Sequence, residues 1–185
     1  MENPGSGRTA KSGLGAEPAC DLPPPYLMES GKGGQAMADQ DLAPRALKIY
    51  FAGAIRGGRA DAELYADLVR HLGRFGQVLT AHVGDEALLH EERLLSEAEI
   101  FQRDMEWLRA ADLVLAEVST PSLGVGFEIG HALAMGKRVI CLHRLGGTGR
   151  LSAMIAGNPS LSLHPYADLD AAKGLLDQIL GQQRA

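Results

Sequence analysis

The chain has 185 residues, of which 45% are apolar, enough to build one domain of ordinary size around a hydrophobic core. Eighteen Lys and Arg residues against 23 Asp and Glu residues give a net charge of −5, which argues against a nucleic acid polymer or an anionic membrane surface as the main partner. No segment approaches the roughly 20 apolar residues of a membrane span, and the two cysteines show no CxxC spacing, so we expect a reduced compartment, the cytoplasm or the nucleus.

Residues 1–45 differ in composition from the rest of the chain. They contain six of the nine prolines and seven of the 23 glycines and have almost no periodic apolar pattern. Such a segment buries too little apolar surface to offset the entropy lost on ordering it. The sequence therefore predicts a disordered N-terminal extension over residues 1–45 and a single folded domain over residues 46–185.

The remaining residues form a regular series of predicted elements. The run "LKIYFAG" predicts a buried strand, and apolar residues then recur at helical spacing from Asp61 until Gly76 closes the segment. The run "QVLTAHV" predicts a second strand, followed by a long polar loop and a helix through "EAEIFQRDMEWLRAA". The run "DLVLAEV" predicts a third strand, and the loop "STPSLGVG" leads to a helix through "FEIGHALAMG". A fourth strand in "KRVICLH", a short helix in "LSAMIAG", a fifth strand in "SLSLHPY" and a helix over residues 168–180 complete the chain.

This alternation of strands and helices indicates one fold class. It predicts a doubly wound α/β domain, Rossmann-like or flavodoxin-like, with a five-stranded parallel sheet and helices on both faces. In such folds, ligands bind beyond the carboxyl ends of the strands, near the point where the strand order reverses. Functional residues are therefore expected directly after the strands.

The first candidate site is the segment from Gly53 to Arg59, "GAIRGGR", which follows the first predicted strand. Glycines let backbone N–H groups approach a ligand, and Arg56 or Arg59 could add a charge-assisted contact to a phosphate. The run matches neither GxGxxG nor GxxxxGK[ST], so it does not indicate a dinucleotide or a triphosphate. The same glycines also fit an ordinary turn, which leaves a small anion site and a structural turn as alternatives.

A second candidate site follows the third predicted strand. The loop "STPSLGVG", which includes Ser122 and Gly124, leads into a helix N-terminus, where free N–H groups and the positive dipole end favour an anion. Ordinary N-capping by a serine or threonine explains the same residues. Glu128, in the helix that follows, is either a charge that complements the dipole or a catalytic group aimed at the pocket.

Three further side chains are candidates on weaker signals. Asp104 could be a solvated charge, but a pair of carboxyl groups at one site is what glycosyl chemistry requires. Tyr50 lies within the first strand, where its buried hydroxyl would need a partner, and His82 at the end of the second predicted strand could orient a ligand or cap the sheet edge. The run "HEERL" lacks the second histidine of HExxH, so the sequence predicts no metal and no cofactor.

Four stretches of the chain resemble a known family: "IYFAGAIRGGR", "VLTAHV", "RDMEWLRAADLVLAEVSTPSLGVGFEIG" and "GRLSAMI". They are similar, in this order, to the 2′-deoxynucleoside 5′-phosphate N-hydrolases of the nucleoside 2-deoxyribosyltransferase superfamily, and the resemblance runs from Leu47 to about Tyr166. It implies a homodimer without a cofactor that cleaves the N-glycosidic bond of 2′-deoxynucleoside 5′-monophosphates. The products would be the free base and 2-deoxyribose 5-phosphate.

The resemblance also implies a role for each candidate residue. Glu128 would be the nucleophile that forms a covalent deoxyribosyl intermediate, Asp104 the acid that assists departure of the base, and Tyr50 the residue that positions the sugar and the nucleophile. Ser152 would reach the phosphate of the neighbouring subunit. The implied substrate-binding residues are Gly53, Ala54, Ile55, Arg56, Gly57, Gly58, Arg59, His82, Ser122, Gly124, Ser152, Ala153 and Met154.

One residue departs from the family pattern. The family usually has serine at the position of Ala54, so one hydroxyl donor is missing here, at a cost of about 0.5 to 1.5 kcal/mol for a neutral hydrogen bond. The preferences for phosphate and for deoxyribose over ribose therefore stay open. Two other functions also stay open: a nucleoside 2-deoxyribosyltransferase that passes the sugar to another base, and a nucleotide-binding module without catalysis.

Overall fold

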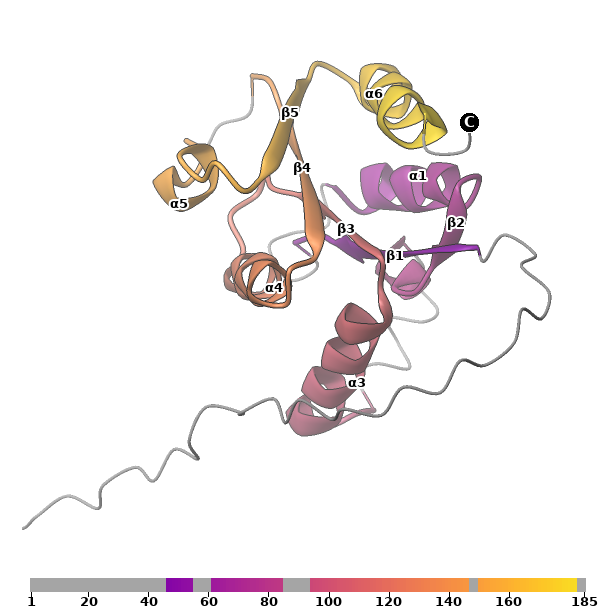
Figure 1. The fold of residues 1–185 in the computed structure, drawn as a ribbon, viewed down its shortest axis with the longest axis vertical. Coiled ribbons are helices and arrows are strands. Elements are labelled where there is room, and N and C mark those ends of the chain that lie inside the picture. Colours follow the sequence, from indigo (N-terminus) through magenta and orange to yellow (C-terminus); the bar gives the residue numbers. More distant parts are fainter. Residues whose placement is uncertain (1–45, 55–60, 85–93, 147–149, 183–185) are drawn as a thin grey trace, which may run out of the picture. The chain divides into compact units, whose positions relative to one another are not determined.

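The computed structural model describes residues 46–54, 61–84, 94–146 and 150–182. The predicted disordered extension and Ile55 to Arg59 of the predicted phosphate site lie outside these ranges. The described residues form one five-stranded sheet in the order β2-β1-β3-β4-β5 (Figure 1), and all four strand pairs are parallel. The doubly wound prediction is confirmed, and this strand order is the flavodoxin-like one.

The elements follow the predicted order. The strands are β1 (Leu47–Ala52), β2 (Gly76–Val78), β3 (Leu113–Glu117), β4 (Arg138–Arg144) and β5 (Ser162–Tyr166). The helices are α1 (Ala62–Leu72), the short 3₁₀ helix η2 (Ala81–Gly84), α3 (Glu97–Ala110), α4 (Leu123–Ala134), α5 (Ala153–Ala156) and α6 (Leu169–Gly181).

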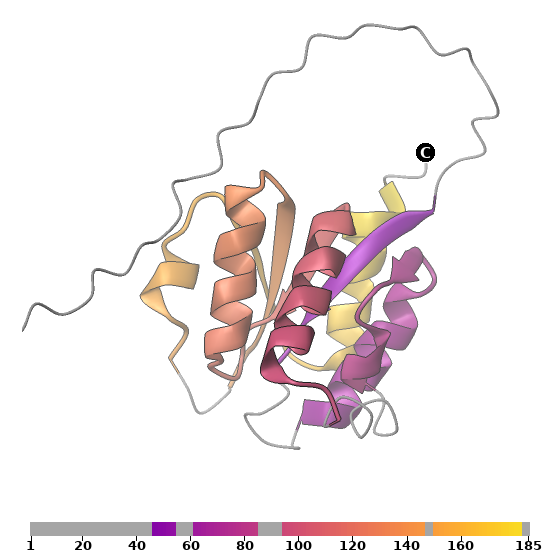
Figure 2. The same ribbon diagram turned by 90° about the horizontal axis from the view of Figure 1, so that it is seen from below.

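The sheet separates two apolar layers. Alternate side chains of a strand point to opposite faces, so Ile49 and Phe51 of β1 pack with α1 and α6, whereas Tyr50 and Ala52 pack with α3 and α4. Figure 2 shows α3 and α4 side by side on one face of the sheet and α1 and α6 on the other. Tyr50 therefore faces the helices that carry Asp104 and Glu128.

The second predicted strand is shorter than expected. Strand β2 has three residues. Beyond it, the side chain of the buried Thr80 bonds to the backbone of β1 in place of a further strand residue: its hydroxyl donates to the Phe51 carbonyl and accepts from the Phe51 N–H, both at 2.8 Å. The chain continues into η2, so the expectation that His82 ends a strand is wrong. Gly76 begins β2 rather than closing a helix, and a side chain there would clash with the Leu47 carbonyl oxygen.

Helix α4 begins earlier than the sequence suggested. The Ser122 hydroxyl accepts a hydrogen bond from the Val125 N–H and caps the helix, which places Gly124 and Gly126 in its first turns rather than in a loop. Glycine has a poor helix propensity, which explains why the pattern alone predicted a later start. The earlier start places Glu128 in the second turn of the helix.

Two general properties follow from the described part of the chain. It contains no helix that is both long enough and apolar enough to cross a membrane. Cys141 is fully buried as a free thiol in β4, and burial raises the pKa of this thiol to about 12. We therefore expect Cys141 to be a chemically inert core residue.

Candidate active site

A tyrosine and a glutamate form the centre of the site. Tyr50 of β1 is 1% exposed, and its hydroxyl donates a 2.7 Å hydrogen bond to Oε1 of Glu128 on α4. Burial, followed by the nearby Glu128 carboxylate, raises the pKa of Tyr50 far above its usual range. The phenol therefore stays protonated and donates to the carboxylate, which fixes the carboxylate's position at the end of the sheet.

Asp104 of α3 is the second carboxylate. It is 22% exposed and accepts from the Arg103 guanidinium at 2.9 Å from Nε and 2.8 Å from Nη2. The Arg103 side chain lies over the Trp107 ring, 4.7 Å from its centroid. Ser96 and Glu99 form a capping box at the start of α3, so the helix that carries Asp104 is well anchored.

The environment of Glu128 changes its acidity. Burial raises its pKa to about 7, the Tyr50 hydrogen bond opposes this shift, and the negative charge of Asp104 adds to it. The effect of Asp104 on both Glu128 and Tyr50 shows that these three groups share one electrostatic environment. A carboxyl group whose pKa lies near neutrality is available in both protonation states, as acid–base and nucleophilic chemistry requires.

The structure describes only the first two residues of the predicted phosphate loop. Gly53 follows β1, and a Cβ there would lie 3.1 Å from the Phe51 ring and 3.2 Å from the Tyr65 ring, so the packing favours glycine. Ala54 is 2% exposed, and its backbone N–H donates to the Tyr65 hydroxyl at 3.3 Å. The hydrogen-bonding capacity of the Ala54 N–H is therefore satisfied within the protein.

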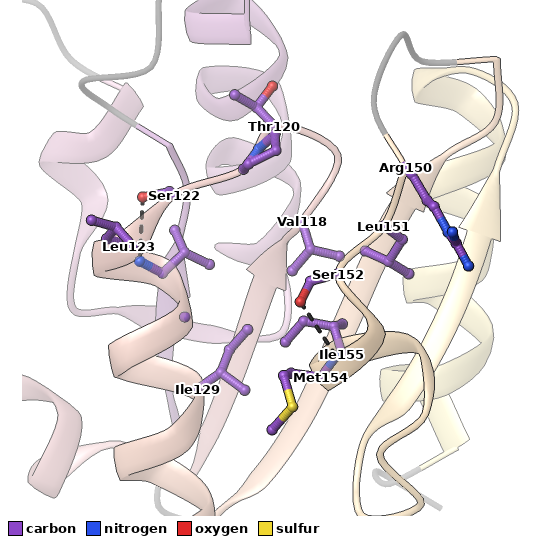
Figure 3. A pocket seen from close by; sticks show the side chains of 13 residues that line it. Val118, Thr120, Ser122, Leu123, Ile129, Arg150, Leu151, Ser152, Met154 and Ile155 are labelled. Carbon is purple, nitrogen blue, oxygen red and sulfur yellow. Dashed lines mark hydrogen bonds between the residues drawn. The ribbon is translucent and has the colours of Figure 1, made fainter.

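Ser122 and Ser152 line a pocket of about 560 Å³ (Figure 3). Leu123, Met154 and Ile129 are among its lining residues. Both serine hydroxyls cap helices, Ser122 that of α4 and Ser152 that of α5, where it accepts from the Met154 N–H. Among the residues described, the pocket lining includes none of Tyr50, Asp104 and Glu128, nor Gly124 and Ala153. The fold therefore places Ser122 and Ser152 on the same pocket. The three catalytic candidates are not among the residues that line it.

A buried polar cluster at the same edge of the sheet was missed by the sequence reasoning. Glu117, the last residue of β3, is fully buried and accepts hydrogen bonds from the Ser119 N–H and hydroxyl, from the Tyr166 hydroxyl at 3.0 Å and from the Tyr65 hydroxyl at 3.5 Å. Burial raises the pKa of Glu117. The one sequence signal for this cluster was a glutamate at the end of an otherwise apolar strand, "LVLAE".

The described residues contain no group of three or more side chains arranged to hold a metal ion. What the site offers is carboxylates and a phenol, with the backbone around Ala54 directly beyond the end of β1. A carboxylate can attack an electrophilic carbon, and carboxyl groups can also donate and accept protons.

Comparison with known proteins assigns the chain to a family. Residues 49–153 match the model of the nucleoside 2-deoxyribosyltransferase family, and the chain belongs to this family. The matched range includes Tyr50, Asp104 and Glu128. The family resemblance seen in the sequence is confirmed.

Individual relatives are more specific in name. A 5-hydroxymethyl-dUMP N-hydrolase from Rattus norvegicus is 51% identical over 111 residues, 59% of this chain and 68% of that protein. A protein of the same name from Tetraodon nigroviridis is 50% identical over 113 residues, 60% of this chain and 80% of that protein. The solved structure of the Clostridium botulinum CMP N-glycosidase BcmB covers 72% of this chain and 99% of its own, with a TM-score of 0.51 and 24% identity, and supports the fold.

Proposed function

We propose that the protein hydrolyses the N-glycosidic bond of 2′-deoxynucleoside 5′-monophosphates to the free base and 2-deoxyribose 5-phosphate. The observation that carries this proposal is the 2.7 Å hydrogen bond from Tyr50 to Glu128, beside a second carboxylate at Asp104. The names of the relatives, which are N-hydrolases of a deoxyuridine monophosphate, support the reaction and the substrate class.

In the first step, Glu128 acts as the nucleophile. Its ionised carboxylate attacks C1′ of the deoxyribose as the C1′–N bond breaks, and the sugar becomes esterified to Glu128. Asp104, which is ionised in the free enzyme, takes up a proton from solvent and delivers it to the base as the base leaves, which lowers the barrier to its departure. The Tyr50 hydroxyl keeps the attacking carboxylate aligned through its hydrogen bond.

In the second step, water attacks C1′ of the glycosyl ester, and Glu128 leaves as a carboxylate. The water loses its proton to Asp104, which releases this proton to solvent and so returns to its ionised starting state. This double displacement retains configuration, and retaining enzymes hold their two carboxyl groups about 5 to 5.5 Å apart.

The residues proposed to bind the 5′-phosphate are Gly53 to Arg59 and Ser122. Arg56 and Arg59 lie outside the described residues, and their contact with phosphate is an assignment from the family resemblance. Ala54 lies two residues beyond the end of the strand that carries Tyr50, so the proposed phosphate loop begins at this end of β1. His82, Gly124, Ala153 and Met154 stay proposed substrate contacts on the same ground.

A panel of substrates tests the function. We expect the wild-type protein to release base from 5-hydroxymethyl-dUMP and other 2′-deoxynucleoside 5′-monophosphates, at a kcat/KM at least about tenfold above that for the unphosphorylated deoxynucleosides. A charged phosphate contact contributes on the order of 1.5 to 3 kcal/mol, which corresponds to a tenfold or larger preference. Chromatography of free base and sugar phosphate measures both products.

Ribonucleoside monophosphates and an added acceptor base complete this panel. Transfer of deoxyribose to the acceptor from an unphosphorylated donor would identify a deoxyribosyltransferase instead, and tight binding without base release would identify a binding module. Ala54→Ser, which restores the usual family residue, is the matched comparison for the choice between deoxyribose and ribose.

We further propose that the protein is a homodimer in which Ser152 completes the site of the partner subunit. The pocket of about 560 Å³ that Ser152 lines does not have Glu128 among its lining residues, which is compatible with a role of Ser152 in a neighbouring site. Leu123 and Met154, at the starts of α4 and α5, are 97% and 80% exposed, and such apolar side chains around one pocket favour a protein interface.

The expected location, the cytoplasm or the nucleus, also stays a prediction.

Sedimentation velocity tests the dimer. We expect the wild-type protein to sediment as a dimer and Leu123→Asp to sediment as a monomer with at least about tenfold lower activity, because a charge cannot be buried in an apolar interface. Leu145→Asp changes another leucine that is 57% exposed and is the matched control. A wild-type monomer with full activity would contradict the proposal.

A further inference from the structure

Arg103 and Asp104 are consecutive residues of α3 whose side chains are in contact. Both guanidinium contacts go to one oxygen: Nε donates to Oδ1 of Asp104 at 2.9 Å, and Nη2 lies 2.8 Å from the same atom. Consecutive residues of a helix point in different directions and do not ordinarily face each other. The Arg103 side chain therefore has to bend along the helix surface to reach its neighbour, and this conformation needs a support.

Trp107 provides that support. It lies four residues after Arg103, on the same face of α3, and the guanidinium carbon is 4.7 Å from the centroid of its ring. A guanidinium stacks well on an aromatic ring and presents its N–H donors in a fixed plane. The side chains of Arg103 and Asp104 are each 22% exposed. Ring, guanidinium and carboxylate therefore form a partly buried unit on the side of α3.

This unit lies where α3 meets α4. Figure 2 shows the two helices next to each other on one face of the sheet, and the Phe101 ring of α3 lies 6.1 Å from the Phe127 ring of α4. Phe101 is one turn before Asp104 on the same face of α3. Phe127 directly precedes Glu128. The ring contact thus brings the part of α3 that carries Asp104 against the part of α4 that carries Glu128.

The charges of Arg103 and Asp104 also act on the centre of the site. Burial is the main cause of the raised pKa of Tyr50, and among the smaller causes the negative charge of Asp104 adds to the shift and the positive charge of Arg103 opposes it. A guanidinium also stabilises the carboxylate that remains after a neighbouring carboxyl group gives up its proton. Arg103 is therefore placed to assist an acid, although it is itself no acid at neutral pH.

We propose that Arg103, held by Trp107, is a positioning residue that fixes the Asp104 carboxyl group for proton transfer to the departing base. This inference rests on the proposed function. Because both guanidinium contacts go to Oδ1, the proton that Asp104 delivers is carried by the other oxygen, Oδ2. As the C1′–N bond breaks, this proton passes to the base, and the guanidinium stabilises the carboxylate left behind. Arg103 touches neither the sugar nor the base in this assignment.

The test compares two leaving groups, 2′-deoxyuridine 5′-monophosphate (dUMP) and its 5-fluoro analogue, in single-turnover reactions with each protein at the pH of its highest rate. Fluorine withdraws electrons from the uracil ring, so the analogue needs less proton assistance to release its base. We expect Arg103→Met, which keeps an unbranched side chain but no donor, to lower the rate about tenfold for dUMP and at most about threefold for the analogue. Arg103→Lys keeps the charge without the planar donors, so its rates should lie between those of Arg103→Met and the wild type.

Arg109→Met is the matched control. Arg109 is an exposed arginine of the same helix, and its replacement removes the same charge while Arg103 and Trp107 stay in place. We expect wild-type rates with both substrates. A variant that merely contains less folded protein loses the same factor with both substrates, so the comparison of leaving groups separates positioning from stability.

A double-mutant cycle with Asp104→Asn tests whether Arg103 acts through Asp104. Once Asp104→Asn has removed the acid, Arg103→Met should lower the dUMP rate at most about twofold further, because coupled residues are not additive. Trp107→Phe keeps a smaller aromatic ring under the guanidinium and should lower the dUMP rate about threefold, again more than the rate for the analogue. This variant and Arg103→Lys keep the test usable if Arg103→Met does not fold.

Equal losses with the two substrates, wild-type rates in the Arg103 variants, or an undiminished loss in the Asp104→Asn background would overturn the inference. Wild-type rates in Asp104→Asn alone would instead remove Asp104 from the proposed mechanism. A wild-type protein that releases no base from either substrate would overturn the proposed function itself.

Discussion

Glu128→Gln is expected to lower base release from a 2′-deoxynucleoside 5′-monophosphate by at least about a thousandfold, as loss of a catalytic nucleophile does in other enzymes. An amide nitrogen and carbonyl oxygen keep the size of the carboxylate, and the carbonyl can still accept from the Tyr50 hydroxyl. The neutral amide, however, cannot form the glycosyl ester. Steady-state and single-turnover release of base, followed by chromatography, measures the loss.

Glu106→Gln is the control for this variant. Glu106 is an exposed residue of α3, two positions after Asp104, and its replacement removes the same charge without changing the Tyr50–Glu128 pair. We expect it to keep wild-type turnover. If Glu128→Gln also kept wild-type turnover, Glu128 would not be the nucleophile and the double displacement would be wrong.

The pH dependence of kcat/KM is expected to show an acid limb with a midpoint near pH 7 in the wild-type enzyme. Burial raises the pKa of Glu128 to about 7, and in the proposed mechanism only its ionised form attacks C1′, so activity should rise as the pH increases through this value. The Tyr50 hydrogen bond stabilises the ionised form, so Tyr50→Phe should move the midpoint to higher pH, by about one pH unit.

Asp104→Asn should move the same midpoint in the opposite direction. Its negative charge disfavours ionisation of Glu128, so its removal lowers the pKa of Glu128 even though the rate itself falls. The second ionisation of the substrate phosphate also lies near pH 6, but it is common to all three proteins and cancels when their profiles are compared. Equal midpoints in the three enzymes would show that the acid limb belongs to another group.

The central part of the fold could be predicted from the sequence because its strands are buried on both faces. Strands β1, β3 and β4 are short apolar runs that end at glycine, at a hydroxyl residue or at a charged residue. A short apolar run of this kind between two helical segments is typical of a strand in a parallel sheet. The end of β2 could not be predicted. The run continues apolar after Val78, but Thr80 bonds to both backbone groups of Phe51 and turns the chain into η2.

The candidate site was predicted only in part. The family resemblance selected Tyr50 and Glu128, and the structure brings them into hydrogen-bond contact, but residue patterns alone left each with a structural alternative. The Glu117 network had no motif, because its hydroxyls come from α1, the β3–α4 loop and β5. Each of these side chains is ordinary in its own segment, and only the tertiary fold makes them partners.

The contact between Tyr50 and Glu128 joins residues 78 positions apart, on a central strand and on a helix that follows the neighbouring strand. Contacts of such large sequence separation form late, after the loop between them has closed. The Tyr50–Glu128 pair therefore cannot exist in a fragment that holds only one of the two halves, nor in a partly assembled sheet. Enzymatic activity regained during refolding should report the assembled β1–β3 core, and should lag behind helix formation measured by circular dichroism.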